Sequence, residues 1–331
     1  MSDKRLGFAC KWVEQTDKGI ESIPDLNTKT TTVAWLNRQP VKTAEQKLWN
    51  IMQYNLSCIS RILIKLGTMP STLRMFRLPS DLLPMYSEPT WNYFWQQPEA
   101  MAYYEREFSA IGNLARQHQI RLSFHPGQFC CIVSNRLDVV DRSLIEMEYH
   151  ADMARHMGYG KAYQDMKINV HLSGKLGIDG FAAAYTKMSP ELRNCITIEN
   201  DEYQQNIDAI LQLKNVPVVL DLHHQWISNK EFISATDDRI KLITDSWKGV
   251  RPVIHYSQSR PEYIGLSDTL PNIIELLSTT TRSKLRAHSD FYVNQRMNDW
   301  ARSHWEWSDI MLESKSKNLA ALELFNEWNH V

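Results

Sequence analysis

The chain has 331 residues, of which 43% are hydrophobic and 23% charged, as in a globular protein with a substantial core. Its formal net charge of -1 excludes a strong overall attraction to polyanions, although a local patch or bound cations can supply positive charge. No apolar run suits a signal core or a membrane span, and the 5 cysteines lack zinc-ribbon or CxxC spacing. We therefore expect a cytoplasmic protein with reduced thiols and no membrane contact.

Short apolar runs alternate with helical patterns along most of the chain. Residues 16–32 are polar and are expected to form a loop. The strands are expected at 5–10, 73–78, 122–124, 167–171, 195–199, 216–224, 251–258 and 309–313. Helices are expected at 43–66, 98–117, 136–157, 180–187, 205–214, in a stretch up to 247, and at 271–277 and 317–328.

This alternation predicts the fold class. Apolar strands separated by helices indicate a parallel sheet that is covered on both faces. Eight such units without a Pro/Gly-rich linker predict an α/β fold, a single TIM (β/α)8 barrel domain over residues 1–331. A doubly wound open sheet is the alternative, but no glycine-rich phosphate fingerprint follows the first strand.

The segment 121–129, RLSFHPGQF, shows how a strand ends in this chain. Pro126 lacks an N–H group and Gly127 favours a tight turn, so the strand ladder should stop after His125. His125 is then placed at the carboxyl end of its strand, with Gln128 and Phe129 on the loop beyond it. A single histidine there would most simply be satisfied by a local hydrogen bond, but other strands end in the same way.

Imidazole and carboxylate groups recur at the expected strand ends, which converge on one face of a barrel. Grouped charges of this kind are destabilising unless cations neutralise them. Nitrogen and oxygen ligands without thiolates suit Mn²⁺, Zn²⁺ or Mg²⁺, and their number predicts two or three ions. The ligand types leave the choice among these metals open, and Mn²⁺ is the one we expect. The expected ligands are Asp81, His125, His171, Glu199, Asp221, His224, His255, His288 and Glu313.

Four assignments have alternatives. Asp81 either ligates metal or caps the following turn, and His288 lies outside a regular strand. His223 and His224 alternate along an expected strand, so one should face inward and the other away. Lys315 either contacts a phosphate or begins a solvated helix.

Several motifs together give the chain a resemblance to the UV damage endonuclease family. They are LGFAC, FRLPSDLLP, RLSFHPGQF, NVHLSG, TIENDE, VVLDLHH, VIHYSQS, AHSD and DIMLESK, which occur in the order found in that family and cover most of the chain. The resemblance implies a metal-dependent, ATP-independent DNA repair endonuclease on a TIM barrel. It would cut double-stranded DNA immediately 5′ of pyrimidine dimers and 6-4 photoproducts.

The resemblance also implies residue roles. The histidines and carboxylates of the strand-end set match family metal ligands, with Asp81 where members have Asp or His. Gln128 and Phe129 match a pair that probes the duplex at the lesion, and Phe8 and Phe129 stand where Tyr is common. Val253 replaces a Lys of some members. We assign catalysis to Glu199, Asp221, Glu313 and Lys315, and DNA binding to Phe8, Gln128 and Phe129.

Other functions remain alternatives. An apurinic-endonuclease-like enzyme or a metal-dependent sugar isomerase or epimerase could use the same barrel, but a sugar enzyme needs fewer ligands and no Gln-Phe pair. A non-enzymatic lesion binder would not need the ligand set. The expected partner is damaged duplex DNA, and the protein is expected to act as a monomer.

Overall fold

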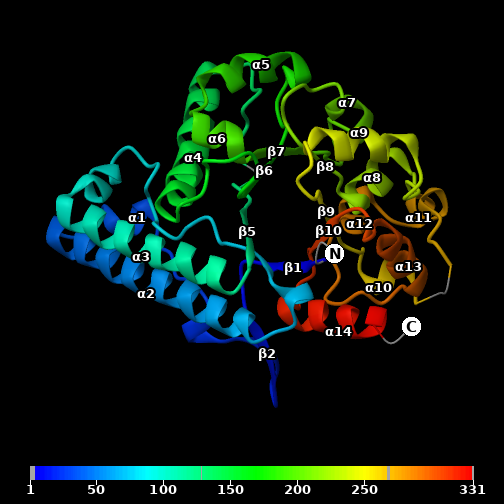
Figure 1. Cartoon of the computed structure of the whole chain (residues 1–331), viewed down its shortest axis with the longest axis horizontal. Helices are drawn as coiled ribbons and strands as arrows, with labels where there is room; N and C mark the ends of the chain where they lie inside the picture. Colours follow the sequence, from blue (N-terminus) through cyan, green and yellow to red (C-terminus); the bar gives the residue numbers. More distant parts are fainter. Residues whose placement is uncertain (1–3, 128, 267–268, 330–331) are drawn as a thin grey trace.

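A parallel sheet of eight strands forms the centre of the computed structural model, which describes residues 4–127, 129–266 and 269–329 (Figure 1). Across the sheet the strands are β8 (Val218–Val219), β7 (Ile196–Glu199), β6 (Lys167–His171), β5 (Arg121–Phe124), β4 (Met75–Arg77), β1 (Leu6–Ala9), β10 (Asp309–Leu312) and β9 (Val253–Tyr256). A parallel bridge between Asp221 and His255 joins the two ends of this order, and His255 N–H donates to the Leu220 carbonyl at 3.0 Å. The expected barrel is confirmed.

Helices follow the strands and surround the barrel (Figure 1). They are α1 (Val33–Leu36), α2 (Val41–Gly67), α3 (Pro98–Gln117), α4 (Leu137–His156), α5 (Gly177–Lys187), α6 (Pro190–Cys195), α7 (Ile207–Ile210), α8 (Leu222–Asn229), α9 (Asp238–Ser246), α10 (Pro261–Ile264), α11 (Ile273–Thr279), α12 (Arg282–Leu285), α13 (Gln295–His304) and α14 (Lys317–Asn329). Short 3-10 helices are η1 (Pro24–Leu26), η2 (Ser71–Leu73) and η3 (Asn92–Gln96).

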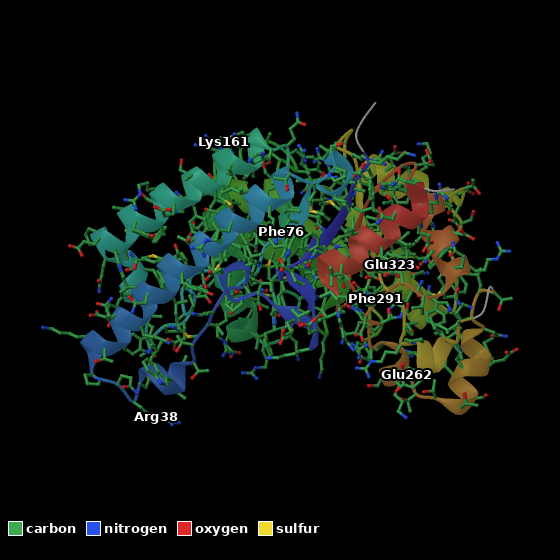
Figure 2. All side chains as sticks on the ribbon, turned by 90° about the horizontal axis from the view of Figure 1, so that it is seen from below. Arg38, Phe76, Lys161, Glu262, Phe291 and Glu323 are labelled. Carbon is green, nitrogen blue, oxygen red and sulfur yellow. The ribbon has the colours of Figure 1, made fainter. Side chains whose placement is uncertain are left out.

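The core lies inside the barrel and between the barrel and its helices. Strand residues such as Leu6, Phe76 and Phe124 are fully buried, and Phe76 is labelled within the packed side chains of Figure 2. Close helix packing depends on Gly112 of α3, where an added Cβ would lie 1.9 Å from the Met157 carbonyl oxygen. Among the residues that the structure describes, none of the helices combines the length and apolarity needed to cross a bilayer.

Two expected elements are shorter than the sequence pattern suggested. The strand expected at 216–224 ends early, because Asp221 caps α8: its Oδ1 accepts a hydrogen bond from His224 N–H at 2.7 Å. His223 and His224 are therefore helical. The helix expected at 205–214 is reduced to one turn, α7, after which Gln212 and Leu213 continue as i→i−3 turns.

A hairpin that the sequence did not indicate overlaps the start of the loop expected at residues 16–32. Strands β2 (Val13–Thr16) and β3 (Gly19–Ser22) pair in antiparallel register and project away from the barrel (Figure 1). Gly19 has φ +109°, which allows the tight connection between the two strands.

Candidate metal centre

The carboxyl ends of the strands bring five candidate ligands to one face of the barrel. His125 follows β5, His171 ends β6 and Glu199 ends β7, while His255 lies on β9 and Glu313 follows β10. The parallel register pairs His171 directly with Glu199. These residues are far apart in sequence, and the closing of the barrel brings them together.

Glu199 occupies the middle of this group. Its Oε2 atom lies 3.3 Å from His125 Nε2 and 3.1 Å from His255 Nδ1, and its Oε1 atom lies 3.3 Å from His224 Nδ1. Glu199 is fully buried, so the surrounding imidazoles replace water as its neighbours. The carboxylate is therefore placed to bridge more than one cation.

The ligand atoms form three overlapping groups, each with its atoms within 4.8 Å of one another. The groups are His125, Glu199 and His255; His171, Glu199 and His224; and Asp221, His255 and Glu313. Glu199 and His255 each belong to two groups. Seven of the nine expected ligands are thus brought together.

The electrostatics of the group are unbalanced without a cation. Burial opposes ionisation of Glu199, but His255 and His171 hold its pKa well below the usual value. Burial raises the pKa of Asp221 to about 8 against the effect of His224, and the nearby Glu199 and Glu313 raise it further. Burial lowers the pKa of His255 to about 4, although Glu199 acts in the opposite direction.

Several buried polar atoms of the candidate ligands have no hydrogen-bond partner. They include Glu199 Oε1, Asp221 Oδ2, His171 Nδ1 and His255 Nδ1. Buried polar atoms are normally satisfied, and each unsatisfied one costs about 1–3 kcal/mol. Convergent carboxylate and imidazole lone pairs fit divalent cations, so the residues present suit the metal cluster that the sequence indicated.

Three further residues support the cluster from inside the barrel, and none of them was expected from the sequence to belong to the site. Lys167 Nζ lies 2.8 Å from His255 Nε2, and the Asn169 amide donates to Glu199. Arg77 forms an ion pair with Glu313. Side chains alternate along a strand, so Lys167 and Asn169 share the inward direction of His171, and this spacing was a usable signal.

Two expected ligands lie outside the three groups. Asp81 is exposed in the turn after β4. His288 is half-buried, its ring centroid 5.7 Å from that of His223, and burial lowers its pKa against the effect of Glu313. His223 turns away from the cluster, with Nε2 3.0 Å from Ser259 Oγ, whereas His224 faces it. This agrees with the expectation that one of the two histidines faces inward and the other faces away.

The candidate phosphate contact Lys315 is exposed at the rim. Its Nζ lies 3.6 Å from Asp290, away from the ligand groups. Lys317 begins α14 and is half-buried: burial lowers its pKa, and Cys10 opposes this effect. No role for Lys317 was expected from the sequence.

The three expected DNA contacts differ in placement. Phe8 is only 1% exposed, and its ring packs edge-on against Trp12 and Phe76 with centroids 5.7 and 5.3 Å away. Its ring is part of the packed core and is not presented at the surface. Phe129 is 86% exposed. Gln128 lies outside the described residues.

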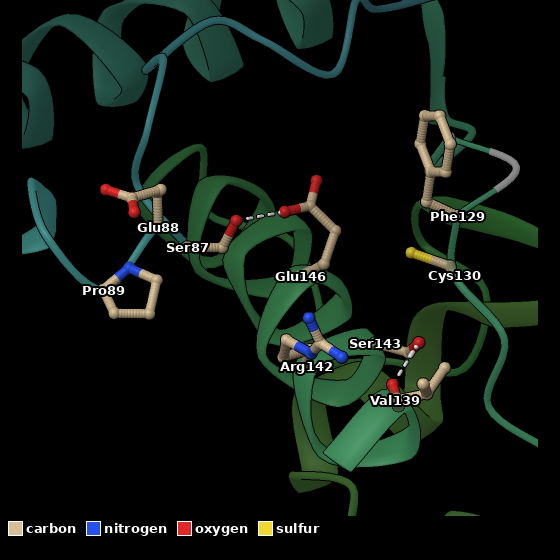
Figure 3. A pocket seen from close by; sticks show the side chains of 10 residues that line it. Ser87, Glu88, Pro89, Phe129, Cys130, Val139, Arg142, Ser143 and Glu146 are labelled. Carbon is tan, nitrogen blue, oxygen red and sulfur yellow. Dashed lines mark hydrogen bonds between the residues drawn. The ribbon is translucent and has the colours of Figure 1, made fainter. Parts of the chain in front are cut away.

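Phe129 stands between two cavities. One, of about 670 Å³, has Phe129 and Cys130 on one side and the hydrogen-bonded pair Ser87 and Glu146 on the other (Figure 3). The second, of about 480 Å³, extends from Phe129 to His171 and Arg286. The exposed ring is thus next to a candidate metal ligand.

Comparisons with known proteins show what this chain is similar to. The sequence profile described as UV-endonuclease UvdE matches residues 4–331. The UV DNA damage endonuclease of Bacillus cereus (strain B4264) is 24% identical over 312 residues, which are 90% of this chain and 88% of that protein. The UV-damage endonuclease of Schizosaccharomyces pombe is 28% identical over 266 residues, 76% of this chain and 40% of that protein.

A solved structure supports the fold. The crystal structure of SacUVDE superposes with a TM-score of 0.75 and 23% sequence identity, covering 99% of this chain and 100% of that one. The family profile spans nearly the whole chain, including every strand of the barrel. This chain therefore belongs to the UV-endonuclease UvdE family.

Proposed function

We propose that this endonuclease hydrolyses a phosphodiester bond of UV-damaged duplex DNA at the cluster centred on Glu199, with divalent cations as cofactors. The observation that carries the proposal is the buried Glu199 carboxylate, with imidazole nitrogens of His125, His224 and His255 3.1–3.3 Å away. Family membership supports UV-damaged DNA as the substrate.

The ligand groups support two or three ions. Glu199 and His255 each belong to two groups, so neighbouring ions would share them. The mixed nitrogen and oxygen set suits Mn²⁺, Zn²⁺ or Mg²⁺, and we propose Mn²⁺. When bound, such ions supply an activated water and neutralise charge on the attacking and leaving oxygens of the phosphodiester.

Residues of the chain hold this arrangement in place. Asn169 donates to Glu199 and fixes the carboxylate plane, and Thr197 Oγ1 donates to Asn169 Oδ1 at 2.8 Å. Arg77 orients Glu313 through an ion pair. Asp221 is fixed through its capping bond to α8, which leaves Oδ2 free for a cation.

DNA recognition is assigned to the loop after β5. We propose that Phe129 enters the duplex at a lesion, where a cross-linked dimer stacks poorly and opening the helix costs less. Its exposure and its position beside His171 in a shared cavity support this role. We further propose ATP-independent cutting by a monomer immediately 5′ of pyrimidine dimers and 6-4 photoproducts.

Mapping the cut on an end-labelled duplex with one pyrimidine dimer tests the proposal. The wild-type protein should give one product that ends immediately 5′ of the dimer, and Glu199→Gln should remove nearly all of it. Glu323→Gln, an exposed glutamate on α14, is the matched control and should cut normally. An undamaged duplex and one with an abasic site distinguish lesion-specific incision from apurinic activity. Cutting of all three duplexes at equal rates would contradict the proposal.

A further inference from the structure

A basic cavity lies between the β2–β3 hairpin and the start of α14. Its volume is about 410 Å³, and we call it the lysine pocket. Its polar lining residues are Lys11, Lys315, Lys317, Ser316, Asp290 and Ser22. Its acidic lining residue, Asp290, does not belong to the candidate metal groups.

The lysine pocket opens on the same face as the metal cluster. Lys11 follows the carboxyl end of β1, and Lys315 and Lys317 follow the carboxyl end of β10. In the sheet order, β4 and β1 separate β10 from β5, which precedes the Phe129 loop. The pocket and Phe129 therefore occupy different sectors of one rim, with the cluster at the centre.

The charge of the lysine pocket is positive. Three lysines oppose one acidic lining residue, Asp290, which is 3.6 Å from Lys315 in an exposed pair of small energetic weight. Neither Lys11 nor Lys317 has an acidic partner within 4.0 Å in the described part of the chain. This local excess contrasts with the net charge of -1 for the whole protein.

The helix that begins at the pocket adds to this charge. α14 has 13 residues, starts at Lys317 and has no acidic side chain in its first turn. The positive end of its dipole therefore lies beside the lysines. Lysines and a helix N-terminus together are the chemistry that binds phosphate oxygens.

We propose that the lysine pocket binds a backbone phosphate of the DNA duplex and so positions the scissile strand over the cluster. The proposal rests on the DNA endonuclease function given above. Phosphate contacts set the register and orientation of a duplex and carry no sequence or lesion information. The pocket would thus hold any duplex, and the Phe129 loop would read the lesion.

The salt dependence of DNA binding tests the pocket. Binding of a labelled duplex is measured by anisotropy between 50 and 200 mM KCl, with a chelator present to prevent cutting. The triple variant Lys11→Gln, Lys315→Gln, Lys317→Gln should flatten the log–log salt slope by ~0.9, the value for one lost phosphate contact. The decrease should be the same for undamaged and UV-irradiated duplexes.

Two variants make the result specific. The triple variant with Arg at the same positions keeps the charges and should retain the wild-type slope. Lys161→Gln removes a lysine from the turn before β6, toward the opposite end of the barrel (Figure 2), and should leave the slope unchanged.

A wild-type slope in the Gln triple variant, or an equally flat slope in the Arg variant, would overturn the pocket assignment while the incision activity stands. If the wild-type protein neither binds duplexes in a salt-dependent way nor cuts damaged DNA, the endonuclease function itself fails. The two failures are therefore distinguishable.

Discussion

The side-chain nitrogen of Lys167 lies 2.8 Å from Nε2 of His255, deep in the barrel below the candidate metal centre. His255 Nδ1 faces the opposite way, 3.1 Å from Glu199 and 3.4 Å from Glu313. Burial lowers the pKa of Lys167 to about 7, so its amine can lose a proton near neutral pH and accept from His255 Nε2–H. That proton position leaves the Nδ1 lone pair available to a cation.

Lys167→Met should therefore weaken metal binding. Loss of the partner that orients a ligating histidine typically costs about 10–100-fold in affinity. Titration of the metal-free variant with Mn²⁺ measures the effect, with Lys161→Met as the control for the same substitution outside the barrel. An unchanged affinity in a folded Lys167→Met protein would show that Lys167 does not orient His255.

His224 gives the metal-free protein a pH-dependent stability. Burial lowers its pKa, but Asp221 and Glu199 more than offset this and raise the pKa well above its ordinary value. The stabilisation is fully present below the ordinary histidine pKa of ~6.5 and is lost as pH rises through the raised folded-state value.

Urea unfolding in the presence of a chelator, from pH 6 to pH 9, measures this contribution in wild type and His224→Gln. The difference in free energy of unfolding between the two should shrink as pH rises. Lys167, whose pKa is lowered by burial, makes a contribution to stability that rises with pH over part of this range. Both proteins contain Lys167, so the difference between them isolates the contribution of His224. A constant difference would contradict a raised His224 pKa.

Phe129→Ala should reduce discrimination between damaged and undamaged DNA. Stacking of a base on an aromatic ring contributes ~1–3 kcal/mol, and this contribution should be lost only where the ring enters the duplex. Anisotropy with both duplexes measures it, and Ile64→Ala on α2 is a control for loss of an exposed hydrophobic side chain. Equal weakening of both duplexes would exclude Phe129 as a lesion probe.

Phe8→Ala should act on stability. Its ring is buried between Trp12 and Phe76, so truncation should lower the free energy of unfolding by about 3–5 kcal/mol. The ratio of affinities for damaged and undamaged duplex should stay at the wild-type value in the fraction that folds. A stable Phe8→Ala protein with lost discrimination would instead place Phe8 at the DNA.

The fold followed from the sequence because apolar strands and helices alternate along the chain. Strand-end residues such as His171 and Glu199 were found for the same reason, since parallel strands share one carboxyl edge. The sequence could not predict which way the Phe8 side chain points. A strand that is covered on both faces has apolar residues throughout, so apolar and polar residues do not alternate along it. Lys167 was not expected at the site, although it lies four residues before His171 and therefore points to the same face of the strand.

The segment around Asp221 shows a second limit. The apolar run before Asp221, with Leu222 after it, is typical of a strand. The Asp221 side chain instead caps a helix that begins at Leu222. A cap depends on one hydrogen bond that periodicity does not report.

The most direct test of the metal-centre account is incision of an end-labelled, UV-irradiated duplex by exhaustively chelated protein, with and without added Mn²⁺. Glu199, Asp221 and the surrounding imidazoles have ligand atoms that only cations would satisfy together, so the account predicts no cutting until Mn²⁺ is restored. Turnover near the normal rate in the chelated protein would contradict it.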